Sequence, residues 1–308
     1  MRQRLFITLG MASLAMATFG MKKPKAAIKS LNAATVQQPS YTEWHDLQVN
    51  AINRFPLHTN FFTYSPEDMV YEEGGKLVSR DLAQVNKTMS KNYLSLEGTW
   101  KFNWVENADQ RPTDFYKVDL DDSNWKTMNL PGIWEMNGFG VPEYVNVGFG
   151  WRGHFDQQPP AVPTKDNHVG SYRRIIDIPA NWDGKQVVAH FGSVTSNIYL
   201  YVNGKFVGYA EDSKVAAEFD ITPYLKKGKN LIAFQTFRWC DGSWDEDQDF
   251  WRLSGVAREC YLFARDAKLH LEDIRVTPDL VNNYKDGVLN ISAKVKGTGK
   301  LNFILFDK

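Results

Sequence analysis

This chain has no excess of positive or negative charge. Its 308 residues carry 36 Lys and Arg against 36 Asp and Glu, so the formal net charge is zero. A nucleic-acid-binding protein needs a basic surface that releases counterions from phosphates. The composition therefore predicts no nucleic-acid partner, and no glycine-rich phosphate loop is present either.

Cysteine is scarce, because only Cys240 and Cys260 occur. Two cysteines make no disulfide framework, although an exported protein could bridge them. Free, buried thiols are the preferred interpretation. The spacing of Cys and His residues matches no metal-site pattern.

A catalytic histidine pattern is also missing. None of the six histidines pairs with a Ser or Cys in a recognisable nucleophile turn. His190 lies in an apolar run and is interpreted as a core histidine with its hydrogen bonds satisfied. The others are scattered along the chain: His45, His58, His154, His168 and His270.

Long apolar runs are absent beyond the N-terminus, so no membrane span is predicted. The first twenty residues have a basic start at Arg2 and Arg4, an apolar run from 5 to 19, and small residues around Ala15 and Ala17. This pattern predicts a signal peptide over residues 1–20 and a periplasmic or extracellular protein. Residues 21–40, rich in Lys, Ala and Gln, are expected to form a linker.

Aromatic residues are the one compositional excess, at 14% with ten Trp. They gather in the stretch from Arg238 to Arg258, which we call the acidic stretch, beside the carboxylates of Asp245, Glu246, Asp247 and Asp249. Sugars need charged acceptors for their hydroxyls and aromatic planes for their C–H faces. The alternative is a structural corner of a β domain, and composition alone leaves the two open.

Short alternating runs with turn signals dominate from residue 91 to residue 266. The clearest is Ser196 to Tyr209, where Asn203-Gly204 separates two apolar runs and predicts a tight hairpin. Further strands are expected at 98–104, 115–122, 125–130, 170–179, 186–192, 218–221, 230–239 and 260–263. Residues 91–266 are therefore predicted to be one all-β jelly-roll sandwich. Residues 41–90 are expected to form an extended arm over a domain surface.

A second pattern begins at about residue 267. Three strands are expected, at 274–277, 287–295 and 300–306, which is the opening of an immunoglobulin-like sandwich that needs about seven strands. We therefore interpret residues 267–308 as a truncated immunoglobulin-like domain and the chain as the front part of something longer.

Six stretches together resemble the N-terminal region of the glycoside hydrolase family 2 β-galactosidases. They cover about residues 43 to 280 and stand in the family's order: 53–58, 95–102, 130–138, 144–147, 208–214 and 238–258. The resemblance implies retaining β-galactoside hydrolysis in a (β/α)₈ barrel that follows the two β domains. Both catalytic glutamates are then expected beyond residue 308, so this chain contains no catalytic residue and is expected to be inactive alone.

The resemblance also implies substrate contacts from the jelly roll to the missing barrel's sugar site. Asn146, in Tyr-Val-Asn-Val, resembles the asparagine that hydrogen-bonds the substrate. Asp212, in Glu-Asp-Ser, resembles the aspartate that contacts galactose hydroxyls and helps to bind a monovalent cation, Na⁺. Mg²⁺ is a further cofactor expected of the full-length enzyme. From the residues alone, Asn146 could be a turn residue and Asp212 a loop cap.

One segment departs from the family pattern: residues 149–155 are more aromatic than expected. Related β-glucuronidases or β-mannosidases share the jelly roll and remain alternatives, as do a stand-alone carbohydrate-binding module and an assembly domain whose arm, 41–62, reaches another subunit of a homo-oligomer. The acidic stretch is then interpreted as a scaffold. We expect Arg238, Arg252 and Arg258 to neutralise its carboxylates while its tryptophans pack against the barrel.

Overall fold

A computed structural model describes residues 38–64, 87–246 and 248–303, and divides the chain into two compact units. One unit contains Val36–Leu57 and Phe62–Ala267, and the other contains His58–Phe61 and Lys268–Lys308. The predicted signal peptide, residues 1–20, lies outside the described residues, as do most of the linker and residues 65–86 of the arm. No helix in the described ranges is long and apolar enough to cross a membrane.

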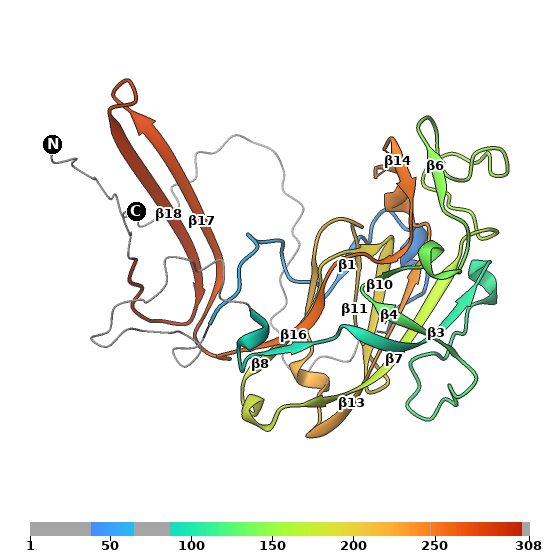
Figure 1. The fold of residues 1–308 in the computed structure, drawn as a ribbon, viewed down its shortest axis with the longest axis horizontal. Coiled ribbons are helices and arrows are strands. Elements are labelled where there is room, and N and C mark those ends of the chain that lie inside the picture. Colours follow the sequence, from blue (N-terminus) through green and yellow to red (C-terminus); the bar gives the residue numbers. More distant parts are fainter. Residues whose placement is uncertain (1–37, 65–86, 247, 304–308) are drawn as a thin grey trace. The chain divides into compact units, whose positions relative to one another are not determined.

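The larger unit is built on an antiparallel seven-stranded sheet (Figure 1). Its strand order is β1-β11-β10-β13-β7-β3-β4, so strands far apart in the sequence lie side by side. The longest pairing joins β13 to β7 over ten residues of each strand. The bounds are β1 (Ala51–Ile52), β3 (Gly98–Val105), β4 (Lys126–Leu130), β7 (Val169–Ile178), β10 (Asn197–Val202), β11 (Lys205–Glu211) and β13 (Gly228–Phe237).

A four-stranded antiparallel sheet of order β12-β8-β16-β2 completes the sandwich. Its strands are β2 (Tyr93–Ser95), β8 (Gln186–Phe191), β12 (Ala217–Asp220) and β16 (Cys260–Arg265). The smaller pairings are β5 (Gly132–Ile133) with β15 (Gly255–Val256) and β9 (Val194–Thr195), and β6 (Glu143–Val145) with β14 (Phe250–Arg252). The predicted all-β, jelly-roll class is confirmed.

Short 3₁₀ helices are the helical elements of the described residues. They are η1 (Glu43–His45), η4 (Lys87–Met89), η5 (Ala108–Gln110), η6 (Glu135–Asn137), η7 (Ala180–Trp182), η8 (Thr222–Tyr224) and η9 (Asp241–Trp244).

The predicted hairpin connects β10 to β11. Asn203 has φ 51° and Gly204 has φ 79°, the positive values that a tight two-residue hairpin turn requires. Asn203 also donates through Nδ2 to the carbonyl oxygen of Tyr224 at 2.9 Å, which ties the turn to η8. The local sequence signal and the long-range contact favour the same turn.

The side chains of β10 alternate between two apolar clusters, because successive residues of a strand point to opposite faces. Ile198 and Leu200 belong to the core between the two sheets, where Tyr172 of β7 stacks on Phe234 of β13 at 4.3 Å. Tyr199 of β10 belongs to a second cluster on the opposite face of the large sheet. This strand is buried on both faces, which is why all six of its residues are buried.

The N-terminal arm and a loop cover that second face. Trp44 stacks on Phe237 at 5.0 Å, and the hydroxyl groups of Tyr41 and Tyr201 hydrogen-bond to each other. Ala51 pairs with Ala210, so the arm adds edge strand β1 to the sheet. The strand expected at 115–122 is absent: that segment is a loop, and the ring of Phe115 is fully buried in the second cluster. An apolar residue that covers a sheet face gives the same sequence pattern as a short strand.

The smaller unit contains a two-stranded ribbon of β17 (His270–Val281) and β18 (Asp286–Lys296). These two strands extend the predicted runs at 274–277 and 287–295. Residues 300–303 form no strand, and residues 304–308 lie outside the described part of the chain. The immunoglobulin-like assignment of residues 267–308 remains a prediction.

Two predictions about buried polar groups are confirmed. Cys240 and Cys260 are both free and buried. His190 is 5% exposed in β8, and its Nδ1 lies 2.7 Å from the carboxylate of Glu218, so this core histidine has a hydrogen-bond partner.

Candidate functional site

The acidic stretch forms a corner that is packed by aromatic rings. Trp239 and Trp244 both contact Trp151, at 5.3 and 4.9 Å between ring centroids. Phe149 contacts Trp244 at 4.2 Å. The unusually aromatic segment 149–155 thus packs against the tryptophans of the acidic stretch, a pairing that explains why both segments are rich in aromatic residues.

The arginines of the acidic stretch contact groups outside the set of carboxylates that we expected. Arg238 is 4% exposed, and its Nη2 lies 2.5 Å from Oε2 of Glu143, a residue that the sequence analysis did not single out. Arg258 donates to the backbone carbonyl of Lys214 at 2.6 Å, and Arg252 donates to the carbonyl of Gln248, also at 2.6 Å. These hydrogen bonds tie segments of backbone together, and the expectation that the arginines neutralise the carboxylates of the stretch stays a prediction. Asp247 lies outside the described residues.

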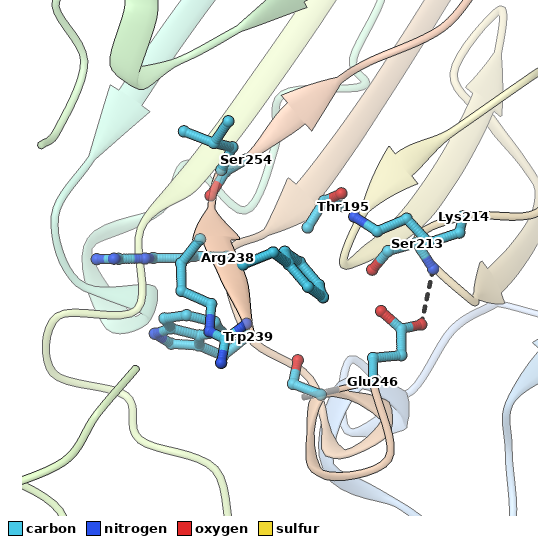
Figure 2. Close-up of a pocket in the computed structure, with 11 residues that line it drawn as sticks. Thr195, Ser213, Lys214, Arg238, Trp239, Glu246 and Ser254 are labelled. Atoms are coloured by element: carbon cyan, nitrogen blue, oxygen red, sulfur yellow. Dashed lines mark hydrogen bonds between the residues drawn. The ribbon is translucent and has the colours of Figure 1, made fainter. Parts of the chain in front are cut away.

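One carboxylate of the acidic stretch holds the loop that contains Asp212. Glu246 accepts the backbone N–H of Ser213 at 2.7 Å (Figure 2). Burial raises the pKa of Glu246, the hydrogen bonds from Ser213 lower it, and the nearby Asp212 carboxylate raises it. The carboxylates of Glu246 and Asp212 therefore repel each other, and the positive charge of Lys214 offsets part of that repulsion.

Asp212 follows the last residue of β11 and is half-buried. Its φ of 89° lies in the left-handed region, which is uncommon for a residue with a Cβ atom. Strained backbone of this kind is found at functional sites more often than elsewhere. The structure therefore places the predicted substrate-binding aspartate in a constrained loop conformation.

Asn146 directly follows β6 and is exposed. Strand β6, which ends just before Asn146, pairs with β14 of the acidic stretch, with Val145 opposite Phe250. The acidic stretch thus connects to both predicted residues: it pairs with the strand before Asn146 and binds the residue after Asp212. β6 and β14 lie together at one end of this unit (Figure 1).

An exposed aromatic pair flanks Asn146. Tyr144 is 53% exposed and Trp251 is 54% exposed, with 5.7 Å between their ring centroids. The hydroxyl of Tyr144 donates to Asp249 at 2.5 Å, and this hydrogen bond raises the pKa of Tyr144. Two exposed rings beside a carboxylate match the chemistry that binds sugars. Of the three tryptophans in the stretch, only Trp251 is exposed.

A small pocket lies between Glu246 and Arg238 (Figure 2). It holds about 40 Å³ of free space, enough for a water molecule or an ion but not for a sugar ring. Neither Asn146 nor Asp212 lines it. A sugar ring would therefore have to bind outside this pocket.

Comparison with known families and proteins gives the same fold. The family model described as "Glycosyl hydrolases family 2, sugar binding domain" matches residues 93–266. Two solved structures of Bacteroides uniformis β-glucuronidases match with TM-scores of 0.51 and 0.50 at 21% and 22% identity. Each match covers 67% of this chain and 22% of the β-glucuronidase chain. At this level of identity the similarity shows the fold alone.

The proteins that are similar in sequence include β-galactosidases. The chain is 37% identical to that of Priestia megaterium over 262 residues, which is 85% of this chain and 24% of that protein. It is 38% identical to that of Halalkalibacterium halodurans, over 83% of this chain and 24% of that protein. For Streptococcus thermophilus the identity is 40%, over 69% of this chain and 21% of that protein.

The chain spans about a quarter of the length of these curated relatives. With the family model matching more than half of its residues, the chain belongs to glycoside hydrolase family 2 and contains the sugar-binding domain of that family.

Proposed function

We propose that this chain is the N-terminal part of a retaining β-galactosidase that hydrolyses terminal β-D-galactosides. The observation that carries the proposal is the 37–40% identity to three β-galactosidases over 69–85% of the chain. Both catalytic glutamates would lie in a (β/α)₈ barrel beyond residue 308. One carboxyl protonates the leaving oxygen and the other attacks the anomeric carbon, and the first then activates water.

Two residues of this chain would contact the galactose. Asn146, exposed after β6, offers a hydrogen-bond donor and an acceptor to one hydroxyl. Asp212, half-buried after β11, accepts hydrogen bonds from two hydroxyls. The acidic stretch would hold both, through β14 and through Glu246. These residues bind and orient the sugar, while the chemical step belongs to the barrel.

Asp212 would also help to bind a monovalent cation. Its carboxylate and that of Glu246 influence each other, and hard cations prefer oxygen ligands, so the donor atoms fit Na⁺ better than a thiophilic metal. A bound Na⁺ would offset the repulsion between the two carboxylates and would offer a Lewis-acidic contact to a sugar hydroxyl. The remaining ligands would come from the barrel.

The proposal is tested on the full-length enzyme with nitrophenyl β-galactoside, β-glucuronide and β-mannoside. We expect the galactoside to have the highest kcat/KM. Preference for the glucuronide or the mannoside would assign the chain to another branch of the family. The chain on its own should hydrolyse none of the three, and turnover by a pure preparation would refute that expectation.

Asp212→Asn tests the site residue. We expect a raised KM for the galactoside and weaker dependence of the kinetics on sodium, because the amide keeps the size of the side chain and loses its charge. Asp183→Asn, at a 74% exposed carboxylate in another loop, is the matched control. If the sodium dependence of Asp212→Asn equals that of the wild type, the cation role is wrong.

Export is a separate proposal that rests on residues 1–20 alone. Expression of the full reading frame in a bacterium, followed by N-terminal sequencing of the periplasmic fraction, tests it. Enzyme that keeps residues 1–20 and stays in the cytoplasm would contradict it.

A further inference from the structure

Three side chains that can bind a metal converge where β11 ends and η9 begins. They belong to Glu211, Cys240 and Asp241, and one potential ligand atom of each lies within 4.8 Å of the other two. Glu211 is the last residue of β11, and Asp241 is the first residue of η9. Two segments about thirty positions apart in the sequence thus supply one cluster.

The backbone makes room for this cluster. Gly242 is the second residue of η9, and a Cβ atom there would lie 2.9 Å from Oε2 of Glu211 and 3.5 Å from Sγ of Cys240. Any larger residue at position 242 would push against both of these ligand groups. The absence of a side chain at Gly242 lets η9 approach Glu211 closely.

The cluster is buried and rich in negative charge. Cys240 is 1% exposed and Asp241 is 4% exposed. Within the described ranges, neither Glu211 nor Asp241 forms an ion pair with Lys or Arg. Buried charges in proteins are paired or coordinate metals, because an unpaired buried charge is costly. The cluster therefore needs either bound protons or a cation.

One oxygen of the cluster is open to an occupant. Oδ1 of Asp241 is buried and has no hydrogen-bond partner among the described residues. Glu211 is partly satisfied, because its Oε1 accepts the hydroxyl of Tyr209 at 2.5 Å. Burial, together with the neighbouring Asp241, raises the pKa of Glu211 to about 8, so a proton between the two carboxyls is the competing occupant. A shared proton would make a hydrogen bond between the two carboxyl groups, whereas a metal ion would bind an oxygen of each and the sulfur of Cys240 as well.

We propose that Glu211, Cys240 and Asp241 bind a thiophilic divalent cation of the Zn²⁺ class. A thiolate ligand selects Zn²⁺ over Ca²⁺ and Mg²⁺, which take oxygen ligands. Tetrahedral zinc with bonds of about 2.0–2.3 Å places its ligand atoms roughly 3.3–3.8 Å apart. The three ligand atoms here lie within 4.8 Å of one another, so side-chain rotations that move them by about an ångström would bring them to zinc-binding distances. Binding releases two protons to solvent, one from the thiol and one from between the two carboxyl groups, and a water molecule fills the fourth position.

The metal would join β11 to η9 and so fix the start of the loop that contains Asp212. Its role is structural, and it is distinct from the Na⁺ proposed at Asp212, because thiolate and carboxylate ligands suit different ions. The inference rests on the geometry of these three residues and does not depend on the β-galactosidase assignment.

Metal titration of the untagged chain, after removal of bound metal by a chelator, tests the proposal. We expect one equivalent of Cd²⁺ to produce a thiolate-to-metal charge-transfer absorption band, and Zn²⁺ to compete for it. Equal concentrations of Ca²⁺ or Mg²⁺ should not compete. A wild-type chain without this band would overturn the proposal and leave the shared proton as the occupant.

The two cysteines provide a matched pair of variants. Cys240→Ser should abolish the band and Cys260→Ser should keep it, since Cys260 is equally buried but lies in β16. The reverse result would also overturn the proposal. Because Cys240→Ser could impair folding, Asp241→Asn is a second variant: it keeps the thiol and should weaken Cd²⁺ binding by about tenfold or more. Unchanged affinity in a folded Asp241→Asn chain would contradict the ligand assignment.

Discussion

Glu246 Oε1 lies 2.7 Å from the backbone nitrogen of Ser213, and this hydrogen bond joins the acidic stretch to the loop that contains Asp212. Ser213 is 1% exposed, so its N–H group has no ready access to water if the carboxylate is removed. This contact explains one of the carboxylates in the stretch, because Glu246 holds the backbone of the loop that contains Asp212.

Replacing Glu246 should destabilise the larger unit. Glu246→Ala leaves the N–H of Ser213 buried without an acceptor, at a cost of about 1–3 kcal/mol in the free energy of unfolding. Glu246→Gln keeps an oxygen acceptor and should lose less. Asp245→Ala, at the exposed carboxylate next to it, should change stability by less than about 0.5 kcal/mol. Chemical denaturation measures all three, and equal losses for Glu246→Ala and Asp245→Ala would contradict the role of the hydrogen bond.

Gly150 should tolerate no side chain. A Cβ atom at this position would lie 2.5 and 2.6 Å from two ring carbons of Trp239, so Gly150→Ala should cost about 1–3 kcal/mol through overpacking. Gly287→Ala, where a Cβ atom meets nothing within 4 Å, is the control. In a Trp239→Leu background the cost of Gly150→Ala should shrink, because the smaller side chain relieves the clash. An unchanged cost in that double-mutant cycle would show that the strain lies elsewhere.

Two substitutions at Asp212 can separate the effect of its carboxylate on binding from the effect of its backbone conformation on stability. With φ at 89°, a residue with a Cβ atom is strained by about 1 kcal/mol or more, which glycine relieves. Asp212→Gly should therefore be more stable than Asp212→Ala by about 1 kcal/mol in thermal or chemical unfolding. In the full-length enzyme both should raise KM for a galactoside to the same extent. Full activity in Asp212→Gly would remove the carboxylate from the proposed sugar site.

His168 should make the fold sensitive to acid. It is 6% exposed, and burial together with the positive charge of Arg238 lowers its pKa below the ordinary 6.5, while Asp166 offsets part of that shift. The unfolded chain then takes up a proton near pH 6.5, whereas the folded chain does so only at lower pH. The contribution of neutral His168 is present above pH 6.5 and is lost as the pH falls from 6.5 towards the lowered value.

His168→Gln should therefore flatten the decline in the free energy of unfolding on acidification below pH 6.5. Denaturation at a series of pH values measures the slope. A wild-type slope in His168→Gln would place the acid sensitivity in other groups.

The sequence by itself determined the features that depend on neighbouring residues. The turn at Asn203-Gly204 follows from the need for positive φ at both positions, and the strands of the large sheet other than β1 follow from their short runs of apolar residues. Family membership also followed from short motifs, because each keeps its residues together in the chain. The free thiols of Cys240 and Cys260 were expected from the cysteine count, since two cysteines make no disulfide framework.

Only the tertiary structure decided which distant partner each side chain meets. Segment 115–122 has a strand-like pattern, yet Phe115 covers a sheet face from a loop, because burial selects apolar residues in either conformation. Arg238 pairs with Glu143, nearly a hundred residues away, and charges within the acidic stretch gave no sign of that choice. Glu211 meets Cys240 and Asp241 only because β11 and η9 are brought together by the sheet. Long-range pairing depends on the packing of the whole sandwich, so no local pattern in the sequence could specify it.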